Sequence, residues 1–231
     1  MNMKTLQTFL SVLVLGATTS YGGIYYNSSP GVTIPDGSPG GYQNSINVSG
    51  LLPTISSVLV YMNVSGGYNG DLYAYLNLGG TSVVLLNRIG AGSGNPFGSS
   101  SSGFGGGATW HNDGVDYSFR LADGSSSVHG ASGSPVEGTY GADGGSLSSF
   151  NGANPNGNWT IFFADMASGP GTSTSSLVSW GLEITAVPEP VNVALGLFGA
   201  GAGVLGLVRS RRVRAQVQRW HAGFIKWVDA V

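Results

Sequence analysis

Short runs of alternating apolar and polar residues, separated by Gly-rich turns, fill the chain between residues 23 and 186. Alternation with a period of two is typical of β-strands buried on one side, and helical periodicity is almost absent here. The pattern predicts strands at Ser45–Val48, Ile55–Val64, Leu72–Leu78, Ser82–Leu86, Val115–Leu121, Trp159–Phe163 and Leu177–Ile184. Many short strands with frequent turns predict an all-β sandwich or barrel.

The same alternation predicts which side of each strand is buried. The residues expected to form the core are Val58, Val60, Met62, Val64, Trp159, Ile161, Phe163, Val178, Trp180, Leu182 and Ile184. Two strands that each bury a tryptophan suggest two sheets packed about 10 Å apart. Residues 90–107 are rich in Gly and Ser and predict a long surface loop.

The amino terminus has the pattern of a signal peptide, assigned to residues 1–22. Lys4 precedes a short apolar segment, and small residues follow it. The alternative is an uncleaved membrane anchor, although the apolar segment is short for a membrane span. The pattern therefore predicts that the chain is exported.

The carboxyl-terminal part holds a second apolar segment, residues 191–208, which contains no charge. At about 1.5 Å per residue, a helix of this length reaches roughly 27 Å, close to the hydrocarbon thickness of a bilayer. It predicts one transmembrane helix. A cluster of basic residues follows and would remain in the cytoplasm as a membrane stop: Arg209, Arg211, Arg212 and Arg214.

Pro188, Glu189 and Pro190 stand directly before this segment. This motif, one apolar helix and an arginine cluster together resemble the PEP-CTERM sorting signal of bacterial exported proteins, over residues 187–214. The resemblance implies that an exosortase-like enzyme recognises the motif and processes the tail. Family tails usually end soon after the arginines, whereas here residues 215–231 follow.

Residues 215–231 continue a helical stripe of apolar residues that includes Trp220 and Trp227. Such an amphipathic extension suits the cytoplasmic surface of a membrane. The alternative is an extension without any role.

Charge is distributed unevenly along the chain. Residues 23–186 contain nine acidic and two basic side chains, whereas residues 209–231 contain six basic and one acidic. An acidic body excludes nucleic acid as a partner, because phosphates call for a cationic surface. The absence of cysteine excludes thiolate metal sites and cysteine nucleophiles, and roughly 160 residues are enough for a core without disulfides.

An ordered series of motifs spans residues 32–186. It comprises Ile34–Asp36, Ile55–Val64, Gly70–Leu76, Leu147–Gly152, Gly157–Ile161 and Val178–Ile184. The series resembles the P domain (P/Homo B) found beside subtilisin-like proprotein convertases, and it implies a jelly-roll-like antiparallel β-sandwich. Relatives often carry His-Thr after the central strand, where this chain has Ser65, Gly66 and Gly67.

Candidate catalytic groups are few. The body contains only His111 and His129, both among polar and glycine residues typical of surface loops, and no Gly-x-Ser-x-Gly elbow. Carboxylates such as Glu137 and Asp143 lie in loops, and sequence cannot pair them as a glycosidase would require. The sequence therefore predicts a protein that is not an enzyme and needs no cofactor.

Calcium is the one metal with candidate ligands. Asp36, Asp71 and Asp165 fall at predicted turns or strand ends, where carboxylates can bind this ion. The alternative is that such aspartates bond turn amides. Scattered tyrosines, Tyr68 among them, could instead stack on sugars.

The leading hypothesis is an exported bacterial protein of the cell envelope or extracellular matrix, anchored by one membrane helix before processing. It would act in adhesion or matrix structure, or bind a surface polysaccharide or matrix polymer. The alternative is an accessory P-like domain that stabilises or recruits a secreted subtilisin-like protease in trans.

Overall fold

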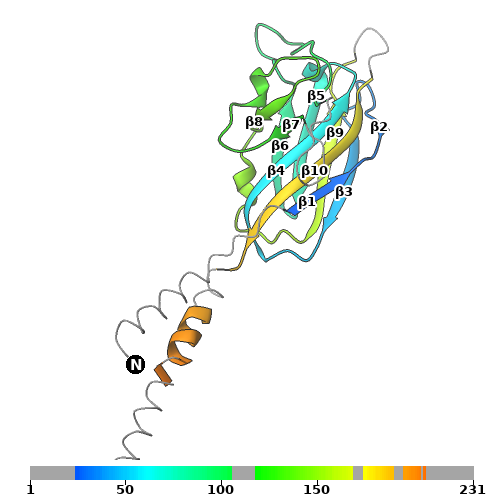
Figure 1. Cartoon of the computed structure of the whole chain (residues 1–231). Helices are drawn as coiled ribbons and strands as arrows, with labels where there is room; N and C mark the ends of the chain where they lie inside the picture. Colours follow the sequence, from blue (N-terminus) through cyan, green and yellow to red (C-terminus); the bar gives the residue numbers. More distant parts are fainter. Residues whose placement is uncertain (1–23, 106–117, 169–173, 190–194, 204, 207–231) are drawn as a thin grey trace, which may run out of the picture. The chain divides into compact units, whose positions relative to one another are not determined.

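The computed structural model describes residues 24–105, 118–168, 174–189, 195–203 and 205–206. The chain divides into two units, Ser20–Val187 and a second unit formed by both chain ends. The first unit contains every strand that the structure describes (Figure 1).

Two β-sheets build the first unit. The larger sheet has the order β1 (Ile24–Ser28), β10 (Ser176–Val187), β4 (Thr54–Ser65), β7 (Phe119–Leu121) and β8 (Gly138–Tyr140), and β2 (Val32–Thr33) also pairs with β10. The smaller sheet has the order β3 (Tyr42–Val48), β9 (Gly157–Asp165), β5 (Leu72–Leu78) and β6 (Thr81–Asn87). All of these strand pairs are antiparallel except β7 with β8.

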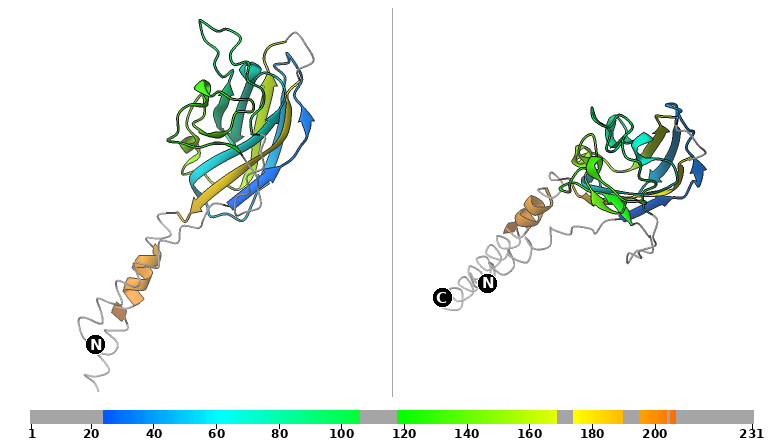
Figure 2. Two further views of the ribbon diagram at one scale, coloured as in Figure 1. Left: turned by 45° about the horizontal axis from the view of Figure 1, so that its top comes forward. Right: turned by 90° about the horizontal axis from the view of Figure 1, so that it is seen from above.

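In the described parts of the connections lie three short 3₁₀ helices: η1 (Asn69–Asp71), η2 (Val128–Gly130) and η3 (Leu147–Phe150). The segment between β6 and η3, drawn in green, gathers at the β4 side of the sandwich, away from β3 (Figure 2). It supplies the irregular loops from which the candidate sites are built.

The predicted strands are confirmed, most of them a few residues longer than expected, and Leu72–Leu78 matches without change. Of the predicted Val115–Leu121, only Phe119–Leu121 forms a described strand, and residues 115–117 lie outside the described part. Sequence reasoning missed β1, β2 and β8. The last two have only two and three residues, too few to show a period.

The core lies between the sheets, as predicted. Trp159 on the smaller sheet and Trp180 on the larger one are both fully buried. The indole Nε1 of Trp180 also donates a hydrogen bond of 2.8 Å to Oδ1 of Asn44 on β3, which links the two sheets directly.

Val178 was expected in the core, but this prediction is wrong because its side chain is 37% exposed. In the pairing of β10 with β4, Leu177 lies opposite Val64 and Ser179 opposite Asn63, so Val178 is an extra residue in a β-bulge. A bulge reverses the alternation, and Leu177 is buried in its place.

The predicted surface loop at residues 90–107 is also only partly correct. Phe104 is fully buried, forms bridges to Val64 and Val136, and packs against Phe119 with ring centroids 5.0 Å apart. The end of this stretch therefore belongs to the core, while residues 106–107 lie outside the described part.

In the second unit, residues 195–203 and 205–206 are helical. Among the described residues, no helix has both the length and the apolar character that crossing a membrane requires. Pro188 is half-buried and Glu189 exposed, whereas the signal peptide, Pro190, the arginines of residues 209–214 and the extension 215–231 lie outside the described part. These assignments remain predictions.

Replacing Trp180 with Phe should lower the free energy of unfolding by about 1–3 kcal/mol, because it leaves the amide oxygen of Asn44 without its donor. Equilibrium unfolding in urea measures the change. Val178→Ala, at an exposed position of the same strand, is the control and should alter the free energy by about 0.5 kcal/mol or less. Equal effects of the two substitutions would contradict the proposed link between the sheets.

Candidate functional site

The outer face of the smaller sheet carries no charged side chain. By strand alternation this outer face comprises Gln43, Ser45, Asn47, Tyr73, Tyr75, Asn77, Ser82, Val84, Asn158, Thr160 and Phe162. The inward-pointing residues of the same strands form the core, so the outer-face residues are not needed to fill it.

Aromatic rings form one part of the outer face. Tyr75 and Phe162 are direct cross-strand partners, and their rings stack with centroids 4.9 Å apart and an interplanar angle of 18°. Tyr73 meets Tyr75 edge-on at 6.4 Å. A Cβ atom on Gly41 would lie 2.7 Å from the Phe162 ring, so a glycine is needed beside it.

Amide and hydroxyl groups form the remainder of the outer face, and they are paired across strands. Asn47 Nδ2 donates to Asn158 Oδ1 at 2.8 Å, and Asn77 Nδ2 donates to Ser82 Oγ at 2.7 Å. Ser45 and Thr160 hydroxyls lie 2.8 Å apart. These bonds restrict the side-chain rotamers, and a face ordered in advance loses less entropy when it binds.

A cavity of about 240 Å³ lies at one end of the sandwich and is here called the end cavity. Its walls are Tyr68 and Asp71 around η1, the loop residues 97–100, and Ala167 with Ser168 after β9. Met166 N donates to Asp71 O at 2.8 Å, which brings the end of β9 against η1.

Asp71 is the unusual residue of the end cavity. It is only 8% exposed, and none of the described residues donates a hydrogen bond to its carboxylate. Burial raises the pKa of this carboxyl above its ordinary value, and the negative charge of Asp165 raises it further.

Asp165 is also buried, and burial raises its pKa as well. Unlike Asp71, it accepts backbone hydrogen bonds, from Ala167 and Gly37. Asp36 stands close enough to raise the pKa of both carboxyls.

The structure thus brings the three candidate calcium ligands into one neighbourhood. Within the described ranges, however, no group of three or more His, Cys, Asp or Glu side chains could hold a metal ion. Calcium binding at Asp36, Asp71 or Asp165 remains a prediction that would require backbone oxygens as further ligands.

Arg88 fixes the loop that forms one wall of the end cavity. Its guanidinium donates to Gly70 O at 3.1 Å and to Pro96 O at 3.0 Å. Its backbone has φ of 52°, an uncommon left-handed conformation for a residue other than glycine. Asn95 braces the same loop by donating to the carbonyls of Gly90 and Gly98.

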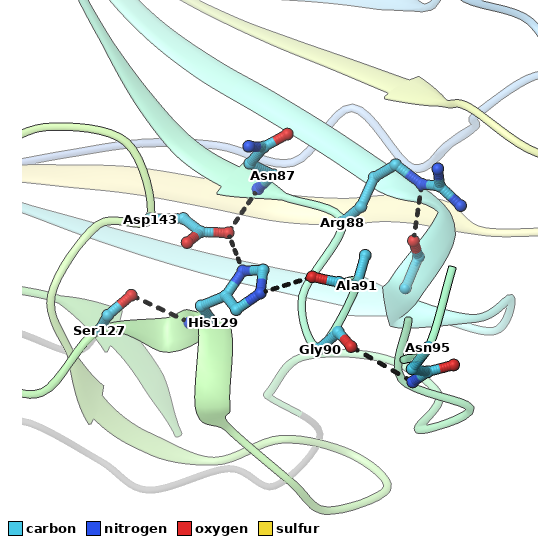
Figure 3. A network of polar contacts seen from close by, with 9 residues as sticks. Asn87, Arg88, Gly90, Ala91, Asn95, Ser127, His129 and Asp143 are labelled. Carbon is cyan, nitrogen blue, oxygen red and sulfur yellow. Dashed lines mark hydrogen bonds and ion pairs between the residues drawn. The ribbon is translucent and has the colours of Figure 1, made fainter. Parts of the chain in front are cut away.

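His129 forms a hydrogen bond to Ala91, near the beginning of the same loop. Its Nδ1 lies 3.0 Å from Asp143 Oδ2, and its Nε2 lies 3.0 Å from Ala91 O (Figure 3). Both partners are acceptors, so both bonds form only when the ring carries two protons. The hydrogen bond to Asp143 raises the pKa of His129 accordingly.

The expectation that His129 lies near the surface is correct, since the side chain is 41% exposed. Sequence reasoning missed its place on η2 and its partners, which are 14 and 38 residues away in the chain. His111 lies outside the described part.

No protein-family model matches this chain, and no curated protein matches it in sequence. Among solved structures, it is similar to the serine protease of Aeromonas sobria, with 15% identity over 71% of this chain and 26% of that one, at a TM-score of 0.41. For the Aeromonas sobria serine protease in complex with the chaperone ORF2, the identity is 15% over 77% of this chain and 29% of that one, at a TM-score of 0.43. The aligned part therefore spans less than a third of those chains.

Stability should depend on pH through His129. Because its folded-state pKa is raised, its bonds contribute fully below about pH 6.5 and are lost as pH rises through that pKa. The free energy of unfolding of the protein minus that of His129→Gln should therefore shrink as pH rises above about 6.5. The contribution should be at most about 1 kcal/mol, since the ring is partly exposed. A difference that grows with pH would contradict this assignment.

Proposed function

We propose that this chain is an exported, non-enzymatic binding module that holds an uncharged polysaccharide of the cell surface or matrix on its outer face. The observation that carries the proposal is the composition of this face, in which stacked aromatic rings lie beside rows of amides and hydroxyls without a single charge.

Sugars present two kinds of surface, and the outer face offers a partner for each. The apolar side of a sugar ring packs on an aromatic face, while amides and hydroxyls exchange hydrogen bonds with sugar hydroxyls. Because neither an uncharged polymer nor the outer face carries charged groups, binding does not require such groups to lose their water, which would be unfavourable. Four neighbouring strands extend over roughly 14 Å, which accommodates more than one sugar unit.

The proposed location rests on the chain ends. The signal-peptide pattern, the motif at Pro188–Pro190, the apolar segment 191–208 and the arginine cluster support export, sorting by an exosortase-like enzyme and temporary anchoring in the membrane. The ordered motifs of residues 32–186 support a P-domain-like, jelly-roll-like body. Recruitment of a secreted subtilisin-like protease in trans stays the alternative.

Phe162→Ala should weaken binding to an insoluble uncharged polysaccharide about tenfold, because removing a central aromatic contact commonly costs more than 1 kcal/mol. Depletion of the protein from solution by a panel of such polymers measures the affinity, and Val178→Ala on the larger sheet is the control.

The substitution Asn158→Ala distinguishes an effect on binding from an effect on stability, because the exposed Asn158 side chain contributes little to the core. It should also weaken binding while leaving the unfolding transition unchanged. Depletion by none of the polymers, together with capture of a protease from the culture medium, would instead favour the accessory function.

The intact mass of the mature protein tests the proposed location. Protein collected from the cell surface and the medium should begin near residues 21–23 and end close to Pro188–Pro190. A chain that still runs to Val231 would contradict processing of the tail and indicate a permanently anchored protein.

A further inference from the structure

The carboxylate of Asp71 has no hydrogen-bond donor among the described residues. As a residue Asp71 is more than nine-tenths buried, and it lines the end cavity. Its carboxylate oxygens are not among the fully enclosed side-chain atoms without a partner and therefore face the cavity. Buried polar groups are nearly always paired, since an unpaired one is unfavourable by several kcal/mol. A carboxylate that faces a cavity without a protein donor can take its hydrogen-bond partner from a ligand.

The charges around the cavity determine whether it favours a positive or a negative ligand. The negative charges of Asp165 and Asp36 both raise the pKa of Asp71, and Arg88 is the only cation among the described residues that acts on it. The guanidinium of Arg88 donates to the carbonyls of Gly70 and Pro96, so it is not hydrogen-bonded to the carboxylate. The cavity is therefore negative and suits a cation.

The side chains that line the end cavity favour an organic ammonium group over a metal ion. Tyr68 and Phe97, both exposed aromatic side chains, line the cavity, and aromatic faces attract organic ammonium groups. Their ring faces offer no oxygen donor to calcium, and no group of three or more His, Cys, Asp or Glu side chains among the described residues could hold a metal ion. Ser99, Ser100 and Ser168 add hydroxyls that can bond a hydroxylated ring.

We propose that the end cavity binds an amino sugar unit, with its primary ammonium group on the carboxylate of Asp71 and its ring against Tyr68 or Phe97. At about 240 Å³ the cavity is smaller than typical pockets for drug-sized ligands and fits a single unit. The site is separate from the outer face, which binds uncharged sugars.

Titrations with glucosamine, N-acetylglucosamine and glucose, followed by NMR chemical shifts at about pH 6, test the proposal. The amine is protonated under these conditions. Glucosamine should bind at least tenfold more tightly than the other two sugars. Asp71→Asn should abolish this preference, whereas the exposed control Glu137→Gln and the outer-face variant Phe162→Ala should retain it.

Other outcomes would overturn the proposal. Equal affinity for the three sugars would mean that hydroxyls, not the ammonium group, are recognised. Calcium binding that depends on Asp71, without glucosamine binding, would make the cavity a metal site.

Thermal unfolding of Asp71→Asn distinguishes lost binding from lost structure. Because the folded-state pKa of Asp71 is raised, its ionisation disfavours the folded state at neutral pH, and the neutral isostere should unfold at the same or a higher temperature. A lower unfolding temperature would show that the carboxylate is structural, which also overturns the proposal.

Discussion

Close packing between the inner faces of the two sheets is the interaction on which the rest of the molecule depends. The chain has no cysteine, and the described residues form only one ion pair, so apolar burial must supply most of the stability. Trp159 and Trp180, one from each sheet, occupy the centre of this core. In the strands of the smaller sheet alternate residues point inward, and the outer face is built from most of the positions between them.

The connections at the end of the sandwich obey a different constraint. They cannot satisfy their backbone groups by strand pairing alone, and side chains therefore supply the missing bonds. Arg88 and Asn95 bond carbonyls within the loop, while His129 fastens Ala91 from η2. These bonds fix the loop that forms one wall of the end cavity. Asp71 lies beside this braced loop, where burial and the charge of Asp165 raise the pKa of its carboxyl.

Sequence reasoning located the strands and most of the core because both follow from a local period of two. It failed where a contact with a distant residue decides the outcome. The bulge that exposes Val178 depends on the register against β4, and the burial of Phe104 depends on Val64 and Val136. The sequence marked Asp36, Asp71 and Asp165 as turn aspartates, but only the fold brings them into one neighbourhood. The side-chain pairs Ser45–Thr160 and Asn47–Asn158 of the outer face could not be predicted either, because each joins residues more than 100 positions apart in the chain.

The pairing of β1 with β10 has a consequence for biogenesis. The first described strand, Ile24–Ser28, finds its partner only in Ser176–Val187, and the central strand β4 needs the same partner. The larger sheet therefore cannot close until nearly the whole body has left the ribosome, and contacts of such high sequence separation form slowly. Until its last strand is made, the larger sheet lacks the partner of both β1 and β4, so the last strand completes the domain.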